Sequence, residues 1–255
     1  MTLPVNDRPT ATITGASPHG AHDPEAAARA VRAMFTSIAP RYDLLNHVLS
    51  FNVDRIWWRR AARSFDSVLQ RPDAQVLDLC CGTGDMSFAL RRRASSSTRV
   101  VGADFSHAML QRASRKSSGT ALRWVEGDAL CLPFRDASFD LVTAAFGFRN
   151  LADYDAGLRE MARILRRGGQ CGLLDFGEPR GWLGKVYRLY FKQILPAVGT
   201  LISGVRGPYA YLPASVERFP SPDEMLGRMK RAGFTDVSWT PYTFGIAGLY
   251  RGTKA

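Results

Sequence analysis

The segment VLDLCCGTGD at residues 76–85 carries the clearest structural signal in the chain. The run Gln75–Leu79 is short and mostly apolar, as expected of a strand that is covered on both faces of a sheet. Gly82 and Gly84 follow it, and glycine lets the backbone turn tightly and approach a ligand closely. A helical stretch then extends to Arg93. The segment therefore predicts a strand, a glycine turn and a helix, the first half of a parallel βαβ unit.

The same rhythm continues downstream. Further strands are expected at residues 99–103, 122–126, 139–146 and 170–176, with helices at 106–116 and 153–165 and a turn at Gly168-Gly169. Near the end of the chain, a helix at 222–232 precedes two strands, 235–240 and 245–250, which are close enough in sequence to pair antiparallel. The pattern predicts an α/β, Rossmann-like fold with a seven-stranded, mostly parallel sheet and an antiparallel edge hairpin.

Domain organisation follows from length and composition. The chain has 255 residues, of which 45% are hydrophobic and 22% charged, an ordinary composition for a globular protein. Residues 1–25 are rich in Pro, Gly, Thr and Ala and are expected to form a disordered tail. Residues 26–255 are expected to form a single domain, with helices at 26–70 and a cap segment at 177–220 that interrupts the alternation.

The charge balance points to an anionic partner. Lys and Arg together number 34 against 23 acidic residues, so the net charge is +11, which suits a nucleic acid, a membrane surface or a phosphorylated ligand. The four cysteines show no CxxC spacing, and we therefore expect reduced thiols in a cytoplasmic protein, without a metal site. No uncharged apolar run is long enough to span a bilayer.

Acidic residues follow the second and third predicted strands. In an open parallel sheet, ligands bind beyond the carboxyl ends of the strands. Asp104 closes the second strand and is suited to accept both hydroxyls of a ribose. Asp128 follows the third strand and is placed to accept the exocyclic amine of an adenine, with the main chain of Ala129 beside it. Together with Gly82 and Gly84, these residues predict a cofactor that contains a nucleoside.

Two cofactors match a glycine turn followed by an acid: a nicotinamide dinucleotide and S-adenosylmethionine. The dinucleotide fingerprint requires a third glycine, and this chain has Ser87 at that position. Asp85 would also repel a pyrophosphate at the helix N-terminus, whereas S-adenosylmethionine carries no phosphate. The sequence therefore favours S-adenosylmethionine. Asp78 also has a purely structural interpretation, as an acid that ties the loop together by accepting backbone N–H bonds.

Four longer stretches carry a family resemblance. They are MFTSIAPRYDLLNHVLSFNVDRIWWR (34–59), VLDLCCGTGDM (76–86), FGFRNLADYDAGLREMARILRRGG (146–169) and YAYLPASVERFPSPDEMLGRMKRAGF (209–234). These stretches resemble the menaquinone/ubiquinone biosynthesis C-methyltransferase family, of the demethylmenaquinone methyltransferase type, and the resemblance covers roughly residues 33–252. It implies the class I S-adenosylmethionine-dependent methyltransferase fold. It also implies donor contacts at Thr83, Asp104, Asp128 and Ala129.

The activity implied by the resemblance is C-methylation of a prenylated quinol. Demethylmenaquinol is the favoured acceptor, and a ubiquinol precursor, or both, is the alternative. A nucleic-acid methyltransferase or binding protein is a remote alternative that rests on the net charge alone, and a non-catalytic scaffold is another. The family often has a serine before its Phe-Gly-x-Arg-Asn phrase where this chain has Ala145, so Ala145 is not among the expected site residues.

Three residues in the resembling stretches are expected to serve the reaction. A hydroquinone carbon becomes nucleophilic when a phenolic proton leaves, because the phenolate pushes electron density to the ortho carbon. Arg149 is suited to stabilise that phenolate, Asn150 to orient the ring oxygen, and Tyr42 to relay a proton. The alternative role for Arg149 is a structural salt bridge with Asp153 or Asp155.

Peripheral contact with a membrane is expected because a prenylated quinol resides there. Residues 182–202 combine aromatic residues with a basic helical face, as an interfacial helix requires; a lid helix packed on the sheet is the alternative. That face holds Lys185, Arg188 and Lys192. A second basic stripe at helical spacing holds Arg55, Arg59 and Arg63. We therefore expect a cytoplasmic protein, peripheral on the inner face of the membrane, with a prenylated quinol as its partner and no nucleic acid. The sequence does not indicate an oligomeric state.

Overall fold

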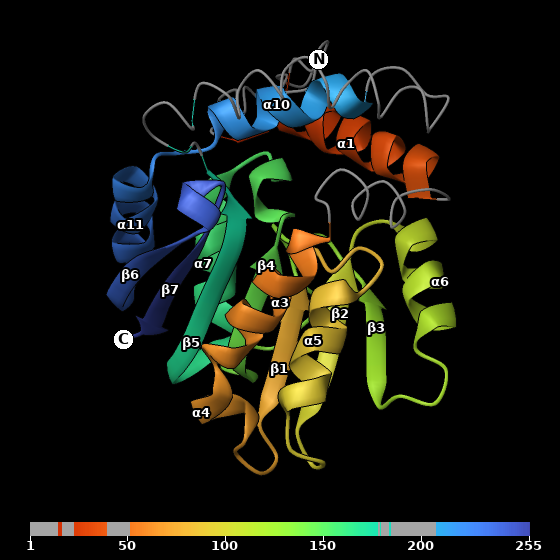
Figure 1. Cartoon of the computed structure of the whole chain (residues 1–255), viewed down its shortest axis with the longest axis vertical. Helices are drawn as coiled ribbons and strands as arrows, with labels where there is room; N and C mark the ends of the chain where they lie inside the picture. Colours follow the sequence, from red (N-terminus) through yellow and green to blue (C-terminus); the bar gives the residue numbers. More distant parts are fainter. Residues whose placement is uncertain (1–14, 17–22, 40–51, 178, 180–183, 185–207) are drawn as a thin grey trace, which may run out of the picture.

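The computed structural model describes residues 15–16, 23–39, 52–177, 179, 184 and 208–255. Within these ranges the chain forms a seven-stranded sheet with the order β3-β2-β1-β4-β5-β7-β6 (Figure 1). The strands are β1 (Gln75–Leu79), β2 (Arg99–Asp104), β3 (Leu122–Glu126), β4 (Phe139–Ala145), β5 (Leu165–Phe176), β6 (Phe234–Tyr242) and β7 (Ala247–Lys254). The order reverses between β1 and β4, and open α/β sheets bind ligands at such a switch point.

Strand directions confirm the predicted sheet. The strands β1 to β5 run parallel, and β7 runs antiparallel to both β5 and β6. The central strands contribute apolar residues to both faces: Leu77 belongs to the core on one side of β1, and Val76 belongs to the core on the other. This two-sided burial is why the parallel strands could be recognised as nearly continuous apolar runs.

Helices cover both faces of the sheet. One face carries α3 (Val53–Arg63), α4 (Asp66–Leu69) and α5 (Asp85–Arg93), the other carries α7 (Tyr154–Ile164) and α11 (Pro222–Arg231), and α6 (His107–Lys116) packs on β2 and β3. In α3, the buried residues Trp58 and Ala62 recur at helical spacing and join Phe65 and Leu90 in one core. The amphipathic pattern of each helix therefore fixes which side faces the sheet.

Two further helices lie across the carboxyl ends of the parallel strands: α1 (Pro24–Ile38) and α10 (Pro208–Arg218) (Figure 1). Asp23 caps α1 by accepting a hydrogen bond from the backbone N of Ala26 at 2.6 Å, an arrangement that stabilises a helix start. Arg32 of α1 forms an ion pair with Glu126 at the end of β3. The helix α10 belongs to the segment predicted to form a cap, and it contacts both α1 and the loop after β4.

The start of β5 differs from the sequence prediction. The strand begins at Leu165 rather than Gln170, and it includes Gly168, which has φ +73°. A register shift against β4 accommodates the extra residues. The glycine pair at 168–169 predicts a turn, but the positive φ that glycine allows here serves a bulge inside the strand.

Part of the predicted N-terminal tail contacts the domain. Gly15 and Ala16 donate backbone hydrogen bonds to the carbonyls of Ala152 and Leu151, at 3.0 and 2.7 Å. The other residues of the predicted tail up to position 22 lie outside the described ranges.

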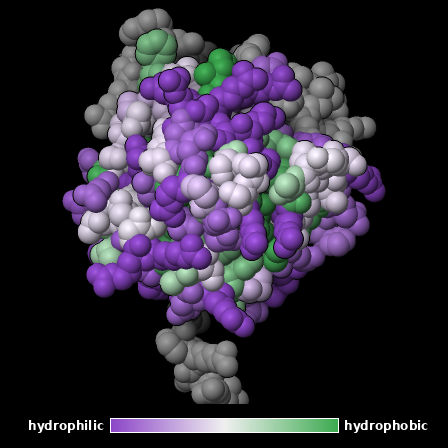
Figure 2. All heavy atoms as spheres, turned by 90° about the horizontal axis from the view of Figure 1, so that it is seen from below, coloured by the Kyte–Doolittle hydropathy of each residue, from purple (hydrophilic) through white to green (hydrophobic). Residues whose placement is uncertain are grey.

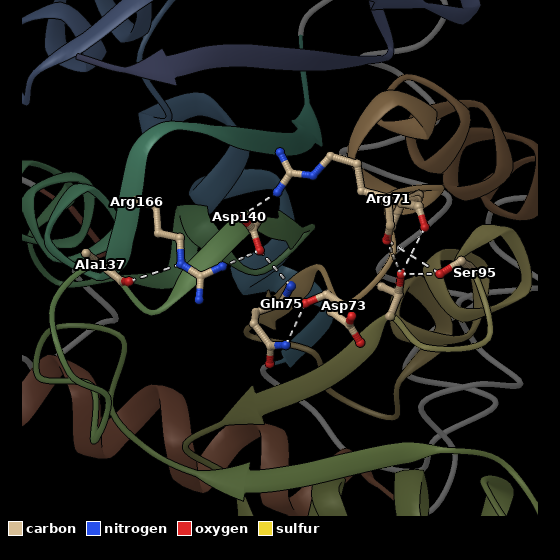
Figure 3. A network of polar contacts seen from close by, with 9 residues as sticks. Arg71, Asp73, Gln75, Ser95, Ala137, Asp140 and Arg166 are labelled. Atoms are coloured by element: carbon tan, nitrogen blue, oxygen red, sulfur yellow. Dashed lines mark hydrogen bonds and ion pairs between the residues drawn. The ribbon is translucent and has the colours of Figure 1, made fainter.

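At the amino ends of β1 and β4, a polar network joins three strands (Figure 3). Asp140 accepts hydrogen bonds from Arg71 Nη2 at 2.5 Å and from Arg166 Nη1 at 2.8 Å. It also accepts one from the backbone N of Gln75 at 2.8 Å. Seen from this end, away from α1 and α10, the surface is largely hydrophilic (Figure 2). This end of the sheet is held by a buried carboxylate that pairs with two exposed arginines, and the candidate site lies at the opposite end.

Candidate active site

The loop between β1 and α5 contains three residues with positive φ. Gly82 has φ +55° and Gly84 has φ +91°, a region that favours glycine. A Cβ on Gly84 would lie 2.5 Å from the ring of Trp124, so close packing also excludes a side chain there. Cys80 has φ +52° although it is not glycine, which places strained backbone at the end of β1. The predicted glycine turn is therefore present.

Asp104, the last residue of β2, is bound to that turn. One carboxylate oxygen accepts from the backbone N of Gly82 at 2.8 Å, and the other accepts from the backbone N of Ser106 at 2.9 Å. Because a carboxylate oxygen has two lone pairs, each retains acceptor capacity. Burial raises the pKa of the Asp104 carboxyl to about 6, against the opposing effect of backbone N–H groups and of Arg32.

Asp128 and Ala129 lie at the same edge of the sheet. Asp128 is exposed and accepts from the backbone N of Leu130 at 2.9 Å, whereas Ala129 is buried. Because β2 and β3 are neighbours, with Asp104 paired to Glu126, the residues that follow them sit beside each other. The structure therefore brings Gly82, Asp104 and Asp128 to the ends of three adjacent elements, as the sequence predicted.

Thr83 connects the glycine turn to α6. Its hydroxyl accepts from Lys116 Nζ at 3.2 Å, and the same ammonium group donates to Asp85 Oδ1 at 2.9 Å. Thr83 is only 2% exposed, so its side chain serves this link. The lysine beside the turn thus already has a carboxylate partner.

Asp78 is an internal tie between β1, β4 and α5. It accepts from Ser87 Oγ at 2.6 Å and from Thr143 Oγ1 at 3.0 Å. Burial raises the pKa of its carboxyl to about 7, although the hydrogen bonds from both hydroxyls and from the Ser87 backbone act in the opposite direction. These contacts support the structural interpretation of Asp78, with hydroxyl donors in addition to the expected backbone N–H.

The donor set fits S-adenosylmethionine. A ribose diol requires acceptors, and Asp104 has remaining capacity on both oxygens; an adenine amine requires one, and Asp128 offers an exposed carboxylate. Asp85 is the first residue of α5, at the helix N-terminus where a pyrophosphate would rest. The chemistry of these residues therefore suits an adenosyl group without phosphates.

Arg149 lies in η2 (Phe148–Asn150), directly after β4, and is 5% exposed. Its Nη1 donates to Asp175 Oδ1 at 3.0 Å, and its backbone N donates to Asp175 Oδ2 at 3.2 Å. Its Nε donates to Ser215 Oγ at 3.3 Å, and Nη1 also donates to the Phe146 carbonyl. Burial raises the pKa of the Asp175 carboxyl, and the Arg149 guanidinium opposes that rise. The result is a buried ion pair at the carboxyl ends of β4 and β5.

The neighbouring Asn150 is held by the covering helix α10. Its Oδ1 accepts from the Tyr211 hydroxyl at 3.1 Å, and Ser215 of the same helix bonds to Arg149. Tyr154, at the start of α7, donates to the Arg149 carbonyl at 3.0 Å. Both predicted catalytic residues in this loop are thus fixed by side chains from three other elements: β5, α7 and α10.

Three aromatic rings pack together beside the ion pair. The ring centroids of Trp57 and Phe146 are 5.8 Å apart, and those of Phe146 and Phe176 are 4.6 Å apart. The Arg149 guanidinium carbon lies 5.2 Å from the centroid of the Phe176 ring. We call Trp57, Phe146 and Phe176 the aromatic wall. It gives the Arg149 side of the site an apolar boundary.

The two halves of the site meet at the switch point of the sheet. A Cβ on Gly147, which follows β4, would lie 2.3 Å from Cβ of Cys80, which follows β1. The Phe146 backbone has φ +56°, so both loops hold a non-glycine residue in the left-handed region. The predicted donor residues, which follow β1 to β3, and the Arg149–Asp175 pair at the ends of β4 and β5 therefore lie on adjoining loops.

The structure corrects one sequence expectation about Arg149. Its ion-pair partner is Asp175, not Asp153 or Asp155. Asp153 caps α7 by accepting from the backbone N of Ala156 at 3.0 Å, and Asp155 pairs with Arg228 at 2.7 Å. Sequence reasoning missed Asp175, although it stands near the end of the fifth strand just as Asp104 ends the second. Of the other predicted residues, Tyr42 and the basic face at 185–192 lie outside the described residues.

Comparison with known proteins identifies the family. The sequence pattern of the ubiE/COQ5 methyltransferase family matches residues 24–254. The chain belongs to this family. A demethylmenaquinone methyltransferase of Deinococcus radiodurans is 50% identical over 229 residues, which cover 89% of this chain and 93% of that protein. A ubiquinone/menaquinone biosynthesis C-methyltransferase UbiE of Geobacter sulfurreducens is 43% identical, covering 88% of each chain.

Solved structures agree on the fold of this ubiE/COQ5 family member. A S-adenosylmethionine-dependent methyltransferase of Thermotoga maritima, described as a possible histamine N-methyltransferase, superposes with a TM-score of 0.62. It is 20% identical and covers 88% of this chain and 99% of that chain. The class I methyltransferase fold is therefore confirmed, and S-adenosylmethionine is the cofactor of the class. Among the described residues, no helix combines the length and apolar character needed to cross a membrane.

Proposed function

We propose that the protein transfers a methyl group from S-adenosylmethionine to a ring carbon of a prenylated quinol, with demethylmenaquinol as the acceptor. The observation that carries this proposal is the buried Arg149–Asp175 pair beside the aromatic wall, at the switch point next to the donor residues. The higher identity to a relative named for demethylmenaquinone supports a naphthoquinol. The relative named for both quinones keeps a ubiquinol precursor as the second candidate.

The donor is assigned to the ends of β1, β2 and β3. Gly82 and Gly84 let the backbone approach it, Asp104 accepts from the ribose hydroxyls, and Asp128 accepts from the adenine amine with the Ala129 main chain alongside. Thr83 contributes through the turn that it anchors. When bound, S-adenosylmethionine supplies a methyl group on a sulfonium, which is already electrophilic.

Arg149 stabilises the reactive form of the acceptor. Loss of a phenolic proton makes the ortho carbon nucleophilic, and a fixed cation at the phenolate oxygen favours that state. Nη1 and Nε of Arg149 already donate to Asp175, Phe146 and Ser215. Nη2 donates to none of the residues that the structure describes, so its N–H groups remain for the phenolate. Asp175 acts as a positioning residue that holds the guanidinium in place.

Asn150 and the aromatic wall orient the ring. The Tyr211 hydroxyl fixes the Asn150 carboxamide by donating to its oxygen, which leaves the amide N–H₂ to donate to the second ring oxygen. The aromatic wall offers flat apolar surface to the quinol and excludes water from the phenolate, which strengthens its interaction with Arg149. Tyr42 is retained as the proposed proton relay from the sequence.

The protein is assigned to the cytoplasmic surface of the membrane, where a prenylated acceptor is available. The sequence of residues 182–202, with its basic helical face and aromatic residues, supports peripheral contact. Apart from Gly184, these residues lie outside the described structure, so this assignment rests on their sequence.

The test is incubation of the full chain with methyl-labelled S-adenosylmethionine and short-chain quinols. One quinol carries the demethylated naphthoquinone ring and the other carries the ring of the ubiquinone precursor, and mass spectrometry locates the label. We expect a labelled methyl group on the naphthoquinol ring carbon. Label on the benzoquinol alone would replace the first candidate by the second, and label on neither ring would overturn the proposal.

A further inference from the structure

Two large apolar side chains are exposed in one area of the described structure. Ile56 on α3 is 60% exposed, and Phe244 on η4 (Thr243–Gly245) is 78% exposed. Trp57 Nε1 donates to Thr243 Oγ1 at 2.8 Å, so the residues next to Ile56 and Phe244 in sequence are in direct contact. The two apolar side chains therefore stand on neighbouring elements and both face solvent.

Four arginines share the exposed face of α3 with Ile56. The buried face of α3 holds its tryptophans and alanines, and the opposite face is exposed. Besides Ile56, that exposed face carries Arg55, Arg59, Arg60 and Arg63. The Arg60 guanidinium carbon lies 4.4 Å from the centroid of the Tyr242 ring, just before η4. No ion pair joins any of the four arginines to a carboxylate of the described residues. We call Arg55, Ile56, Arg59, Arg60, Arg63 and Phe244 the α3/η4 patch.

The α3/η4 patch lies on the outer side of the proposed acceptor site. Trp57 follows Ile56 directly, and its ring belongs to the aromatic wall, 5.8 Å from Phe146 and 6.2 Å from Phe176. The helix α3 therefore turns its basic and apolar face to solvent and Trp57 toward Phe146 and Phe176. A hydrophobic acceptor at the patch would be separated from the site by a single helix.

We propose that the α3/η4 patch docks the protein on a membrane surface that contains anionic lipids. The proposal rests on the proposed function, because a prenylated acceptor must be taken from a membrane. Unpaired arginines bind lipid phosphates, and exposed apolar side chains enter the boundary between headgroups and acyl chains. The net charge of +11 favours the same partner. Phe244 has φ +58°, a conformation that is costly for a bulky residue and is usually kept for function.

Vesicle binding tests the docking surface. The full chain is sedimented with vesicles of phosphatidylcholine mixed with phosphatidylglycerol, and with vesicles of phosphatidylcholine alone. Binding to the mixed vesicles should fall about tenfold or more in R59Q/R63Q, because each arginine near an anionic surface contributes on the order of a factor of five. The control R167Q/R231Q removes the same charge from exposed positions on β5 and α11 and should bind within about twofold of the natural chain. Equal binding by the two double variants would overturn the proposal.

A second double variant tests the apolar side chains of the α3/η4 patch. I56Q/F244N should reduce binding to the mixed vesicles about fivefold while leaving the charge unchanged; asparagine tolerates the positive φ at position 244. An RNA oligonucleotide is measured in parallel. If R59Q/R63Q loses RNA binding and keeps vesicle binding, the patch binds nucleic acid and the proposal is wrong.

Activity separates this inference from the proposed function. With a short-chain quinol in solution, R59Q/R63Q should methylate at the natural rate, because the patch does not touch the reacting groups. With a long-chain quinol in mixed vesicles, its rate should fall in parallel with binding. A natural chain that binds vesicles through the patch but methylates neither quinol would contradict the proposed function and leave the docking result intact. An unchanged rate on the vesicle-bound quinol would contradict the docking role.

Discussion

Asp140 and Asp175 both pair with arginine, at opposite ends of adjacent strands and in different surroundings. The two arginines on Asp140 are 53% and 46% exposed in their side chains, whereas the Arg149 side chain on Asp175 is 6% exposed. Partial burial works against ionisation of Asp140, but hydrogen bonds from Gln75, Arg166 and Arg71 lower its pKa overall. At Asp175, burial dominates and raises the pKa.

The difference separates a structural tie at Asp140 from the pair for which we propose a function. Arginines whose guanidinium groups stay in contact with water lose little hydration. The Asp140 network can therefore hold the strand ends together at a small desolvation cost. Burying both partners costs several kcal/mol per ion before their attraction is counted, and such strongly perturbed pairs concentrate at functional sites. We therefore expect substitutions at Arg149 to affect turnover and stability together, and substitutions around Asp140 to affect stability alone.

The largest effect is expected for Arg149→Ala. Turnover should fall about 100- to 1,000-fold, because the phenolate loses its fixed cation. The free energy of unfolding should fall by about 3–5 kcal/mol, because the Asp175 charge is left buried without a partner. Initial rates with labelled donor and urea unfolding measure the two effects. Binding of S-adenosylhomocysteine, measured by calorimetry, should change little.

The double variant Arg149→Gln/Asp175→Asn is the matched control for this loss. It removes both charges, so most of the stability should return while turnover stays low. Recovery of turnover together with stability would show that the pair only supports the fold, and the contrast with Asp140 would disappear.

A second effect is expected for donor affinity at Asp104. Its pKa of about 6 means that the carboxyl becomes neutral as pH falls below 6, and it then loses acceptor capacity for the ribose hydroxyls. Affinity for S-adenosylhomocysteine should therefore fall about tenfold between pH 7 and pH 5. Asp104→Asn should bind weakly at both pH values, and Asp85→Asn serves as the control that keeps the pH dependence. A pH-independent affinity in the natural chain would contradict the assignment of Asp104.

A smaller effect is expected at the amino end of the sheet. The pKa of Asp140 is lowered in the folded state, so its ion pairs stabilise the fold above the ordinary carboxyl pKa near 4, and this contribution is lost as pH falls through the folded value. Asp140→Asn should reduce the free energy of unfolding by about 1–3 kcal/mol at pH 7 and by less near pH 3. Urea unfolding at both pH values measures this, and turnover should not change.

The smallest effect is expected for Arg166→Ala. Asp140 keeps Arg71 and the Gln75 N–H in this variant, so the loss should be at most about 1 kcal/mol. Thermal unfolding and the methyl-transfer rate provide the measurement. A large fall in turnover would mean that the two ends of the sheet are coupled and that the Asp140 network is more than a structural tie.

The sequence predicted most of the sheet because its strands carry their own signal. The runs that became β1, β2 and β3 are apolar and bounded by turns, and their predicted bounds differ from the observed ones by at most one residue. The start of β5 was missed because a bulge and a turn both place glycine at positive φ, as Gly168 does. Only the pairing with β4 distinguishes the two, and that pairing is not local in sequence.

The site was predictable where one residue type at one strand end sufficed. Gly82 and Asp104 could be predicted in this way. The ion-pair partner of Arg149 could not be predicted from the sequence. Asp153 and Asp155 are nearer in sequence, but Asp175 is nearer in space, on the adjacent parallel strand. The contributions of α10 through Tyr211 and Ser215 likewise depend on how a distant helix folds back over the sheet, which spacing alone does not determine.

The indole of Trp124 packs closely against two glycines. Gly102 on β2 stands opposite Trp124 on β3, and a Cβ at position 102 would lie 2.4 Å from the Trp124 ring. Gly84 meets the same ring, but its positive φ requires glycine in any case. Positions 102 and 124 should therefore change together during evolution. A related protein with a smaller residue in place of Trp124 has room for alanine at position 102. Position 84 should remain glycine, because its positive φ requires glycine.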